Sequence, residues 1–164
     1  TIIKAINNVK KLPVKVIVLG DGRYKETALS LIKEKGLESH FNFLGSFHPT
    51  EMPKFFSHAD ALLVSLKKEK IFSLTIPAKI QSYLACGKPI IASIDGEGAK
   101  IVNNANCGVT SLAEDSLTLS KKIIELMALD KSKRSEMGNN GRAYYEKEFD
   151  RNNLLEKLES IFKS

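Results

Sequence analysis

The sequence predicts an α/β fold in which a Rossmann-like parallel sheet is covered by helices on both faces. Short apolar segments alternate along the chain with segments of helical periodicity, which is typical of βαβ units. The apolar segments are short and rich in branched residues, as expected for strands buried on both faces of a parallel sheet. Hydrophobic residues make up 43% of the 164 residues, which is enough for one core. We therefore expect a single domain over residues 1–164.

The first half of the chain contains three predicted strands. Gly20-Asp21-Gly22 ends the first and Gly45 ends the second, while Ala28, Leu29 and Ile32 recur between them at helical spacing. In order, we expect a helix end at Ile3–Lys10, a strand at Val14–Leu19, a helix at Tyr24–Lys35, a strand at Phe41–Leu44, a short helix capped by Thr50 and running through Phe56, and a strand at Ala61–Ser65.

The second half is organised around a helix that begins near Pro77. Thr75 is a suitable N-cap, Pro77 suits the first turn, and Gly87 is a typical helix stop. Beyond it we expect a strand at Ile90–Ala92, a loop at Asp95–Gly98, a short helix at Ala99–Asn104, a weak strand opening at Val109, and helices from Ser116 with breaks near Asp130 and Asp150.

The start of the Pro77 helix is a predicted anion site. The helix opens just after a loop containing Ser73 and Thr75, and Lys79 lies in its first turn. Free N–H groups and the positive end of the helix dipole favour a phosphate there. Ligands of parallel sheets bind at the carboxyl ends of the strands, where we expect this helix to begin.

Charge and cysteine content narrow the function classes. The net charge is +6, and basic residues cluster at 67–70 and 131–134. These clusters are either solvated faces or contacts for anionic lipid headgroups or a phosphorylated substrate. The chain has no Trp, and its basic residues are not interleaved with aromatics, so we expect no nucleic-acid partner.

Cys86 and Cys107 are too few for a disulfide framework, which favours a cytoplasmic protein. No apolar run approaches the ~20 residues that span a bilayer.

An ordered set of motifs resembles a known enzyme family. The set runs from Val18-Leu19-Gly20-Asp21-Gly22 and Phe43-Leu44-Gly45, through the run that begins at Pro77-Ala78-Lys79 and ends at Gly87-Lys88-Pro89, to Gly138-Asn139-Asn140-Gly141-Arg142. It resembles the C-terminal, donor-binding half of retaining GT-B glycosyltransferases of the family-4 type. The Pro77 run is similar to the branch that transfers N-acetylfucosamine-like aminosugars in surface-polysaccharide and O-antigen assembly.

The sequence departs from that family in two respects. Many relatives carry two glutamates eight positions apart in this region, and the corresponding residues here are Leu74 and Ser82. The resemblance also implies an N-terminal acceptor domain and a first strand of this half that precede the chain. We therefore expect a fragment, or one polypeptide of a split enzyme.

Two residues are the candidate catalytic groups. Lys79 would neutralise the departing diphosphate, and its alternative is an exposed first-turn lysine. Glu97 would bond donor-sugar hydroxyls in place of the missing glutamate, and its alternative is an acid at a helix start. Phe47 is either a wall beside the base or a packing residue under the short helix. The residues expected to bind the nucleotide sugar are Gly20, Gly22, Arg23, Gly45, Phe47, Ser73, Thr75, Ala78, Lys79, Ile80, Ser82 and Gly96.

The resemblance implies a transferase that moves a sugar from a nucleoside diphosphate to a cell-surface polysaccharide or lipid-linked acceptor. The isolated chain would be inactive, and its location would be cytoplasmic, with peripheral contact to the inner face of the membrane. No metal site and no cofactor beyond the nucleotide sugar are expected. The alternative is a non-catalytic nucleotide-binding subunit that pairs with a separate N-terminal partner. A dinucleotide oxidoreductase is disfavoured because Lys25 stands where a third glycine belongs.

Overall fold

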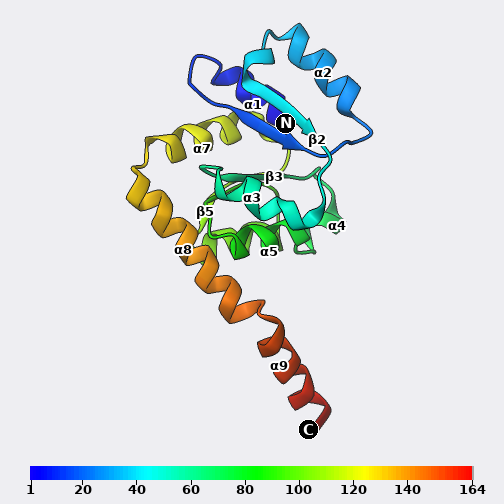
Figure 1. The fold of residues 1–164 in the computed structure, drawn as a ribbon, viewed down its shortest axis with the longest axis vertical. Helices are drawn as coiled ribbons and strands as arrows, with labels where there is room; N and C mark the ends of the chain where they lie inside the picture. Colours follow the sequence, from blue (N-terminus) through cyan, green and yellow to red (C-terminus); the bar gives the residue numbers. More distant parts are fainter. Residues whose placement is uncertain (164) are drawn as a thin grey trace.

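The computed structural model describes residues 1–163, and helices and strands alternate along them (Figure 1). The elements are α1 (Ile2–Asn8), β1 (Val16–Leu19), α2 (Lys25–Glu34), β2 (Phe41–Gly45), α3 (Met52–Ser57), β3 (Leu62–Ser65), α4 (Lys70–Ser73), α5 (Ala78–Ala85), β4 (Ile90–Ser93), α6 (Glu97–Asn104), β5 (Gly108–Ser111), α7 (Ser116–Ala128), α8 (Lys131–Glu148) and α9 (Arg151–Lys163). Short 3-10 turns lie at Glu38–His40 and Pro49–Glu51.

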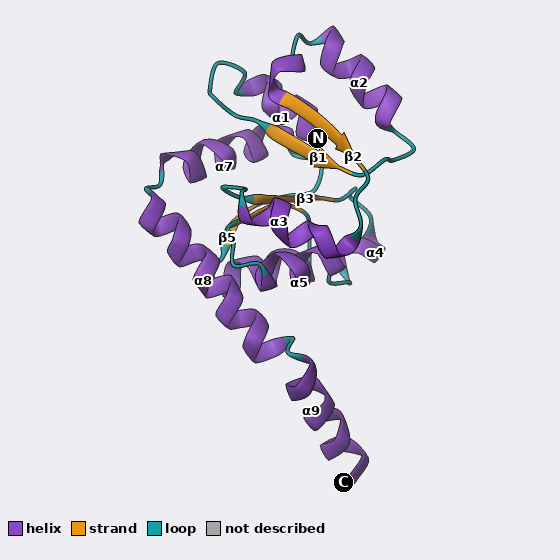
Figure 2. Ribbon diagram, in the orientation of Figure 1, coloured by secondary structure: helices purple, strands orange, loops and turns teal. Residues whose placement is uncertain are grey.

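All strand pairs of the described residues are parallel, as the sequence predicts. The strands form two sheets rather than one: β1 pairs with β2, and β3, β4 and β5 form a second sheet in that order. Figure 2 shows the β1–β2 pair set apart from the β3–β5 sheet, with α1 and α7 beside it. The predicted α/β class with parallel strands covered by helices is confirmed, and the strands are divided between two sheets because no described strand pairs with both β1 and β3.

Alternation along β4 divides the core into two layers. Ile91 of β4 and Val109 of β5 belong to a cluster that α1, α2 and α7 complete. Ile90 and Ala92, on the opposite face of β4, belong to a second cluster with α5, α6 and α8. Strand side chains alternate between the two faces of a sheet, so each face receives its own helical layer.

The α5–α8 junction depends on close backbone contact. Gly87 ends α5 with a φ of +63°. A Cβ at Gly138 of α8 would lie 2.1 Å from the Gly87 carbonyl oxygen. Arg142 Nη1 also donates to the Ala85 carbonyl oxygen over 2.8 Å. The predicted stop at Gly87 is confirmed, and α8 packs against the C-terminal end of α5.

Several boundaries differ from the predicted ones. The N-cap of α5 is Pro77, because the Thr75 hydroxyl donates back to the carbonyls of Ile71 and Phe72 at 3.3 and 3.5 Å. Thr50 lies inside a 3-10 turn whose cap is His48. The α4 turn was not predicted. The breaks near Asp130 and Asp150 are confirmed by the ends of α7, α8 and α9.

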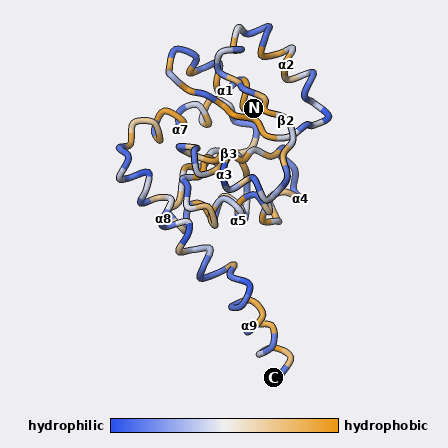
Figure 3. Tube along the Cα trace, in the orientation of Figure 1, coloured by the Kyte–Doolittle hydropathy of each residue, from blue (hydrophilic) through white to orange (hydrophobic). Residues whose placement is uncertain are grey.

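The last helix projects away from the rest of the molecule (Figure 1). Figure 3 shows apolar residues on α9 as well as in the sheets. Its exposed apolar residues recur at the spacing of one helix face. They are Leu154, Leu155, Leu158, Ile161 and Phe162, with exposed fractions from 45% to 81%.

Candidate functional site

The amino end of α5 lies at the carboxyl edge of the β3–β5 sheet. β3 and β4 are parallel neighbours, so the segment between them must return from the end of β3 to the start of β4. α5 makes that return and therefore begins where β3 ends. Ala78 and Lys79 are exposed at this start. The predicted anion site is thus open to solvent and on the ligand edge of the sheet.

The N–H groups at this end are only partly engaged. The Ile80 N–H donates to the Pro77 carbonyl oxygen over 2.9 Å. The N–H groups of Ala78 and Lys79 have no acceptor within the helix, because the first turn of a helix lacks preceding carbonyls. Ile80 itself is fully buried, so only its backbone can face a ligand. The start of α5 therefore offers two amides and the Lys79 ammonium group to an anion.

A tight contact brings the α6 start beside this edge. Gly96 has a φ of +71°, and a Cβ there would lie 1.8 Å from the Ser73 carbonyl oxygen. Gly98 is buried, and a Cβ there would lie 3.0 Å from Cδ of Pro77. The turns that precede α5 and α6 are thus packed against each other, and Glu97 lies between the two glycines.

Glu97 is already engaged with a neighbouring cation. Its Oε1 lies 2.7 Å from Lys100 Nζ, one helical turn away, and the Glu97 side chain remains 48% exposed. Surface pairs of this kind hold weakly and exchange readily. The Glu97 carboxylate can thus accept a bond from a sugar hydroxyl if its exposed ion pair with Lys100 breaks. Its proposed role stays a prediction.

The other predicted site residues occupy two loops of the β1–β2 sheet. The Gly20 N–H donates to the Gly45 carbonyl oxygen over 2.7 Å, which joins these loops. Gly22 and Arg23 are exposed at the first loop. Phe47 packs on Phe55 of α3 with ring centroids 4.4 Å apart, and it remains 37% exposed. The packing interpretation of Phe47 therefore has direct support, and a wall beside a base stays compatible with its exposed part.

Three predicted hydroxyl residues are occupied locally. Ser73 donates to the Lys70 carbonyl oxygen over 2.8 Å, and Ser82 donates to the Ala78 carbonyl oxygen over 3.2 Å. Thr75 is similarly bonded to the α4 turn. These hydroxyls can still accept a bond from a ligand, since a hydroxyl both donates and accepts. Among residues 1–163, no three His, Cys, Asp or Glu side chains gather in a way that would hold a metal ion.

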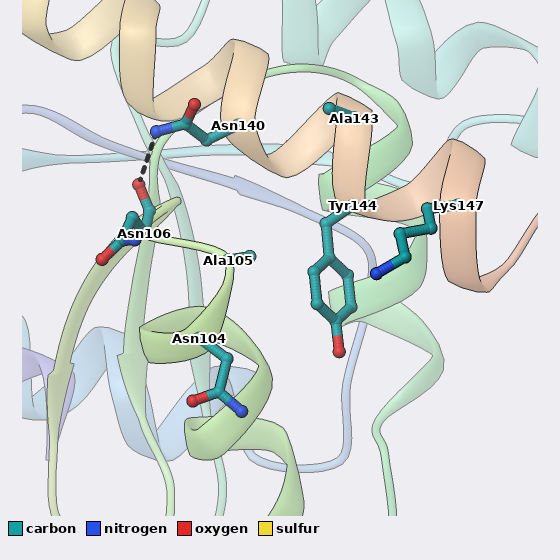
Figure 4. Close-up of a pocket in the computed structure, with 7 residues that line it drawn as sticks. All are labelled: Asn104, Ala105, Asn106, Asn140, Ala143, Tyr144 and Lys147. Atoms are coloured by element: carbon teal, nitrogen blue, oxygen red, sulfur yellow. Dashed lines mark hydrogen bonds between the residues drawn. The ribbon is translucent and has the colours of Figure 1, made fainter.

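Two hollows lie largely outside the predicted site residues, and only Gly96 belongs to both sets. One hollow has a volume of about 320 Å³ and lies beside the turn from α6 to β5. Figure 4 shows residues that line it, among them Asn140, whose amide donates to the Asn106 carbonyl oxygen. This hollow lies at the amino end of β5, away from the ligand edge. A larger pocket, of about 550 Å³, lies at the carboxyl ends of β4 and β5. The pocket was not predicted as a whole, although the sequence shows two parts of its lining: the strand-end loop at Asp95–Gly98 and the polar pair Thr110-Ser111.

Comparison with known proteins shows which family the chain belongs to. Its sequence matches the glycosyl transferases group 1 family over residues 1–144. The chain belongs to this family. The fold class and the resemblance to group 1 glycosyltransferases are thereby confirmed.

Individual relatives and structural neighbours of this group 1 domain are consistent with that assignment. It is 29% identical, over 91% of its length, to a GDP-mannose-dependent monoacylated alpha-(1-6)-phosphatidylinositol monomannoside mannosyltransferase of Corynebacterium glutamicum. Its fold is similar to that of Anabaena HepE in complex with UDP (TM-score 0.79, 23% identity, 97% of this chain). It is also similar to the C-terminal domain of the group 1 glycosyl transferase LpcC from Francisella tularensis (TM-score 0.72, 22% identity, 91% of this chain and 77% of that one). The chain spans only 39% of the Corynebacterium protein and 44% of HepE.

Proposed function

We propose that the chain is the donor-binding half of a glycosyltransferase that takes its sugar from a nucleoside diphosphate. One observation carries this proposal: the amino end of α5 is exposed at the ligand edge of the sheet, with Lys79 in its first turn. Membership of the group 1 family supports the reaction class. Such an end favours anions, and phosphate groups bind well there.

The proposed reaction breaks the bond between the anomeric carbon and the diphosphate oxygen. The electron pair stays on the diphosphate, whose growing charge the Lys79 ammonium and the α5 amides stabilise. An acceptor hydroxyl attacks the anomeric carbon and gives its proton to the departing diphosphate or to solvent. Retention of configuration follows from the family resemblance and requires attack on the same face. Glu97 would orient the sugar through its hydroxyls.

The donor and acceptor are the finer part of the proposal. The Corynebacterium relative is named for GDP-mannose, and HepE was solved with UDP. These names differ in the base, so a hexose or an aminosugar on either nucleotide fits the family. The Pro77 run favours an aminosugar of the N-acetylfucosamine kind and a surface polysaccharide or lipid-linked acceptor. The nucleotide sugar is itself the donor substrate, and we propose no resident cofactor.

A second domain would supply the acceptor side. The chain spans about two fifths of its relatives, which leaves room for a domain of similar size. Two features of the described residues would receive it: the edges of β1 and β3 that pair with no other described strand, and the exposed apolar face of α9. We propose that the remainder of the enzyme, on the same or a separate polypeptide, covers these surfaces.

Contact with a membrane is a further part of the proposal. Among residues 1–163, no helix combines the length and apolar composition that crossing a bilayer requires. The exposed basic residues at 67–70 supply charge for anionic headgroups. The enzyme would then act on the cytoplasmic face, and co-sedimentation with anionic vesicles tests that placement.

Titration with UDP, GDP and ADP tests the donor site directly. One nucleotide should raise the melting temperature of the chain and shift the amide resonances of Lys79 and Glu97. Lys79→Ala should weaken that binding by about 10-fold, since bonds from charged donors are the stronger ones. Lys133→Ala is the matched control, because Lys133 is likewise exposed in the first turn of a helix, and α8 contacts the opposite end of α5. Equal loss in both variants, or no protection by any nucleotide, would reject the site.

A further inference from the structure

The segment between β3 and α5 carries three aliphatic side chains that the described chain leaves exposed. Ile71, Leu74 and Ile76 have exposed fractions of 60%, 64% and 38%. Ile71 and Leu74 lie three positions apart on the α4 turn, so they project from the same side of it. Figure 1 shows α4 at the rim of the molecule, next to the start of α5. Apolar side chains that gather on a surface are typical of a contact site.

Unpaired lysines flank these apolar side chains along the chain. The sequence from Lys67 to Lys79 contains four lysines and one glutamate, a formal charge of +3. Lys67, Lys70 and Lys79 are exposed, and within the described residues none of them pairs with a carboxylate. Lys68 lines a pocket together with Asp95, so its charge is partly balanced. The charge beside the apolar side chains is therefore positive and free to meet an anion.

The last carbonyl groups of α4 are bonded to side chains of the same turn. The Ser73 hydroxyl donates to the Lys70 carbonyl oxygen over 2.8 Å. The Thr75 hydroxyl lies 3.3 Å from the Ile71 carbonyl oxygen and 3.5 Å from that of Phe72. Carbonyls at a helix end otherwise take their hydrogen bonds from water. The turn can therefore enter a layer that is poor in water and leave few backbone acceptors unpaired.

The combination of charge and apolar surface distinguishes between the occupants of this segment. A membrane with anionic lipids presents phosphate groups directly above an apolar layer, which matches lysines beside aliphatic side chains. Lysine stems can lie along the apolar layer while the ammonium group stays at the level of the headgroups. A soluble anion would satisfy the lysines only and would leave Ile71 and Leu74 in water. The segment therefore fits an anionic lipid surface better than a free phosphate.

We propose that residues 67–76 dock the protein on an anionic membrane, with Ile71 and Leu74 inserted at the boundary of headgroups and acyl chains. Lys67 and Lys70 would contact the lipid phosphates. The segment leads directly into α5, so docking would turn the ligand edge of the sheet toward the bilayer. An acceptor anchored in that bilayer would then reach the donor sugar without leaving it. This docking rests on the membrane contact of the proposed function and deepens it, and it does not require the donor site.

Co-sedimentation with vesicles tests the docking. One set of vesicles contains phosphatidylglycerol and phosphatidylcholine, a second contains phosphatidylcholine alone, and glycerol phosphate is added in excess at constant ionic strength. The chain should sediment with the anionic vesicles, stay in solution with the neutral ones, and remain bound when glycerol phosphate is present. Equal binding to both vesicles, binding to neither, or release by glycerol phosphate would overturn the proposal.

Ile71→Ser separates insertion from attraction by charge. It should weaken binding to the anionic vesicles by about 5- to 10-fold, because an aliphatic side chain no longer leaves water. Ile124→Ser is the matched control, since Ile124 is also an exposed isoleucine on a helix but lies on α7, outside the segment. It should bind like the wild type. Equal losses in the two variants, or wild-type binding by Ile71→Ser, would refute insertion at α4.

Nucleotide protection keeps this inference apart from the donor site. Measured without vesicles, it should be the same in Ile71→Ser as in the wild type, because Ile71 is not one of the nucleotide-binding residues. Loss of vesicle binding alone would thus reject the docking and leave the donor site standing, and loss of nucleotide protection alone would do the reverse. Self-association that Ile71→Ser abolishes, in a chain that ignores vesicles, would assign the surface to a second copy of the chain and overturn the proposal.

Discussion

Gly96 lies so close to Ser73 that a Cβ on Gly96 would be 1.8 Å from the Ser73 carbonyl oxygen. This contact holds the turn before α5 against the turn before α6. Lys79 and Glu97, which belong to different βα units, are consequently fixed on the same edge of the sheet. Two independent features require glycine at position 96: its φ of +71°, and the absence of space for a side chain.

The first prediction concerns this contact. Gly96→Ala should lower the free energy of unfolding by about 3 kcal/mol, since it adds backbone strain to a clash with main-chain atoms that cannot turn aside. It should also abolish nucleotide protection if the two turns form one site. Chemical denaturation of Gly22→Ala is the control, because a Cβ at Gly22 meets nothing within 4 Å. Similar unfolding midpoints for the two variants would contradict the account.

The second prediction separates the possible roles of Glu97. In the complete enzyme, Glu97→Gln should lower turnover by about 10-fold or more while changing the unfolding free energy by less than about 0.5 kcal/mol, because an exposed ion pair contributes little. Lys100→Met breaks the same ion pair but keeps the carboxylate. It should therefore retain activity. A parallel loss in both variants would assign Glu97 to helix stability, and full activity of Glu97→Gln would end its catalytic role.

The order and type of most elements follow from periodicity and turn residues. β2 at Phe41–Gly45 and the stop at Gly87 illustrate this, because local chemistry alone decides them. The predicted cap at Thr75 failed because α4 forms before it and takes its hydroxyl. A four-residue helix leaves no periodic signal in the sequence.

The candidate site is predictable in part. The exposed start of α5 follows from Pro77 and the alternation of strands and helices. The Gly96–Ser73 contact does not, since it depends on segments that are distant in sequence and close in space. The division into two sheets was also beyond a residue-by-residue argument, because strand pairing is a property of the assembled layers.

The third prediction concerns the apolar face of α9. Leu158 is 49% exposed, so Leu158→Asp should leave the unfolding midpoint of the 164-residue chain nearly unchanged. In a polypeptide that includes the proposed second domain, the same change should lower the melting temperature and the activity, because it would place a carboxylate in an apolar interface. Glu156→Asp, a conservative change on the same helix, serves as the control. An unaffected longer enzyme would show that α9 does not receive that domain.

The fourth prediction uses the two thiols. Cys107 is fully buried and its Sγ lies 3.5 Å from the Val102 carbonyl oxygen, whereas Cys86 is half-buried. Burial raises the pKa of the Cys107 thiol to about 11; it also raises the pKa of Cys86, where the Arg142 charge acts in the opposite direction. Iodoacetamide at mildly alkaline pH should therefore label Cys86 well before Cys107. Cys86→Ala should remove the early labelling, and rapid modification of Cys107 in the folded chain would contradict its burial.

The raised pKa of Cys107 also predicts how the stability of the folded chain changes with pH. In the unfolded chain the thiol ionises at its ordinary pKa of 9.0, and in the folded chain only near 11. The folded state thus keeps a proton that the unfolded state has lost, so stability is fully present below pH 9 and declines as the pH rises toward 11. The loss from this group amounts to roughly 3 kcal/mol once both states are ionised. Denaturation of Cys107→Ala between pH 8 and 11 isolates it: the variant should be less stable at pH 8, because it leaves a cavity, but its stability should fall less steeply with pH than that of the wild type. Identical slopes would show that other groups cause the alkaline loss.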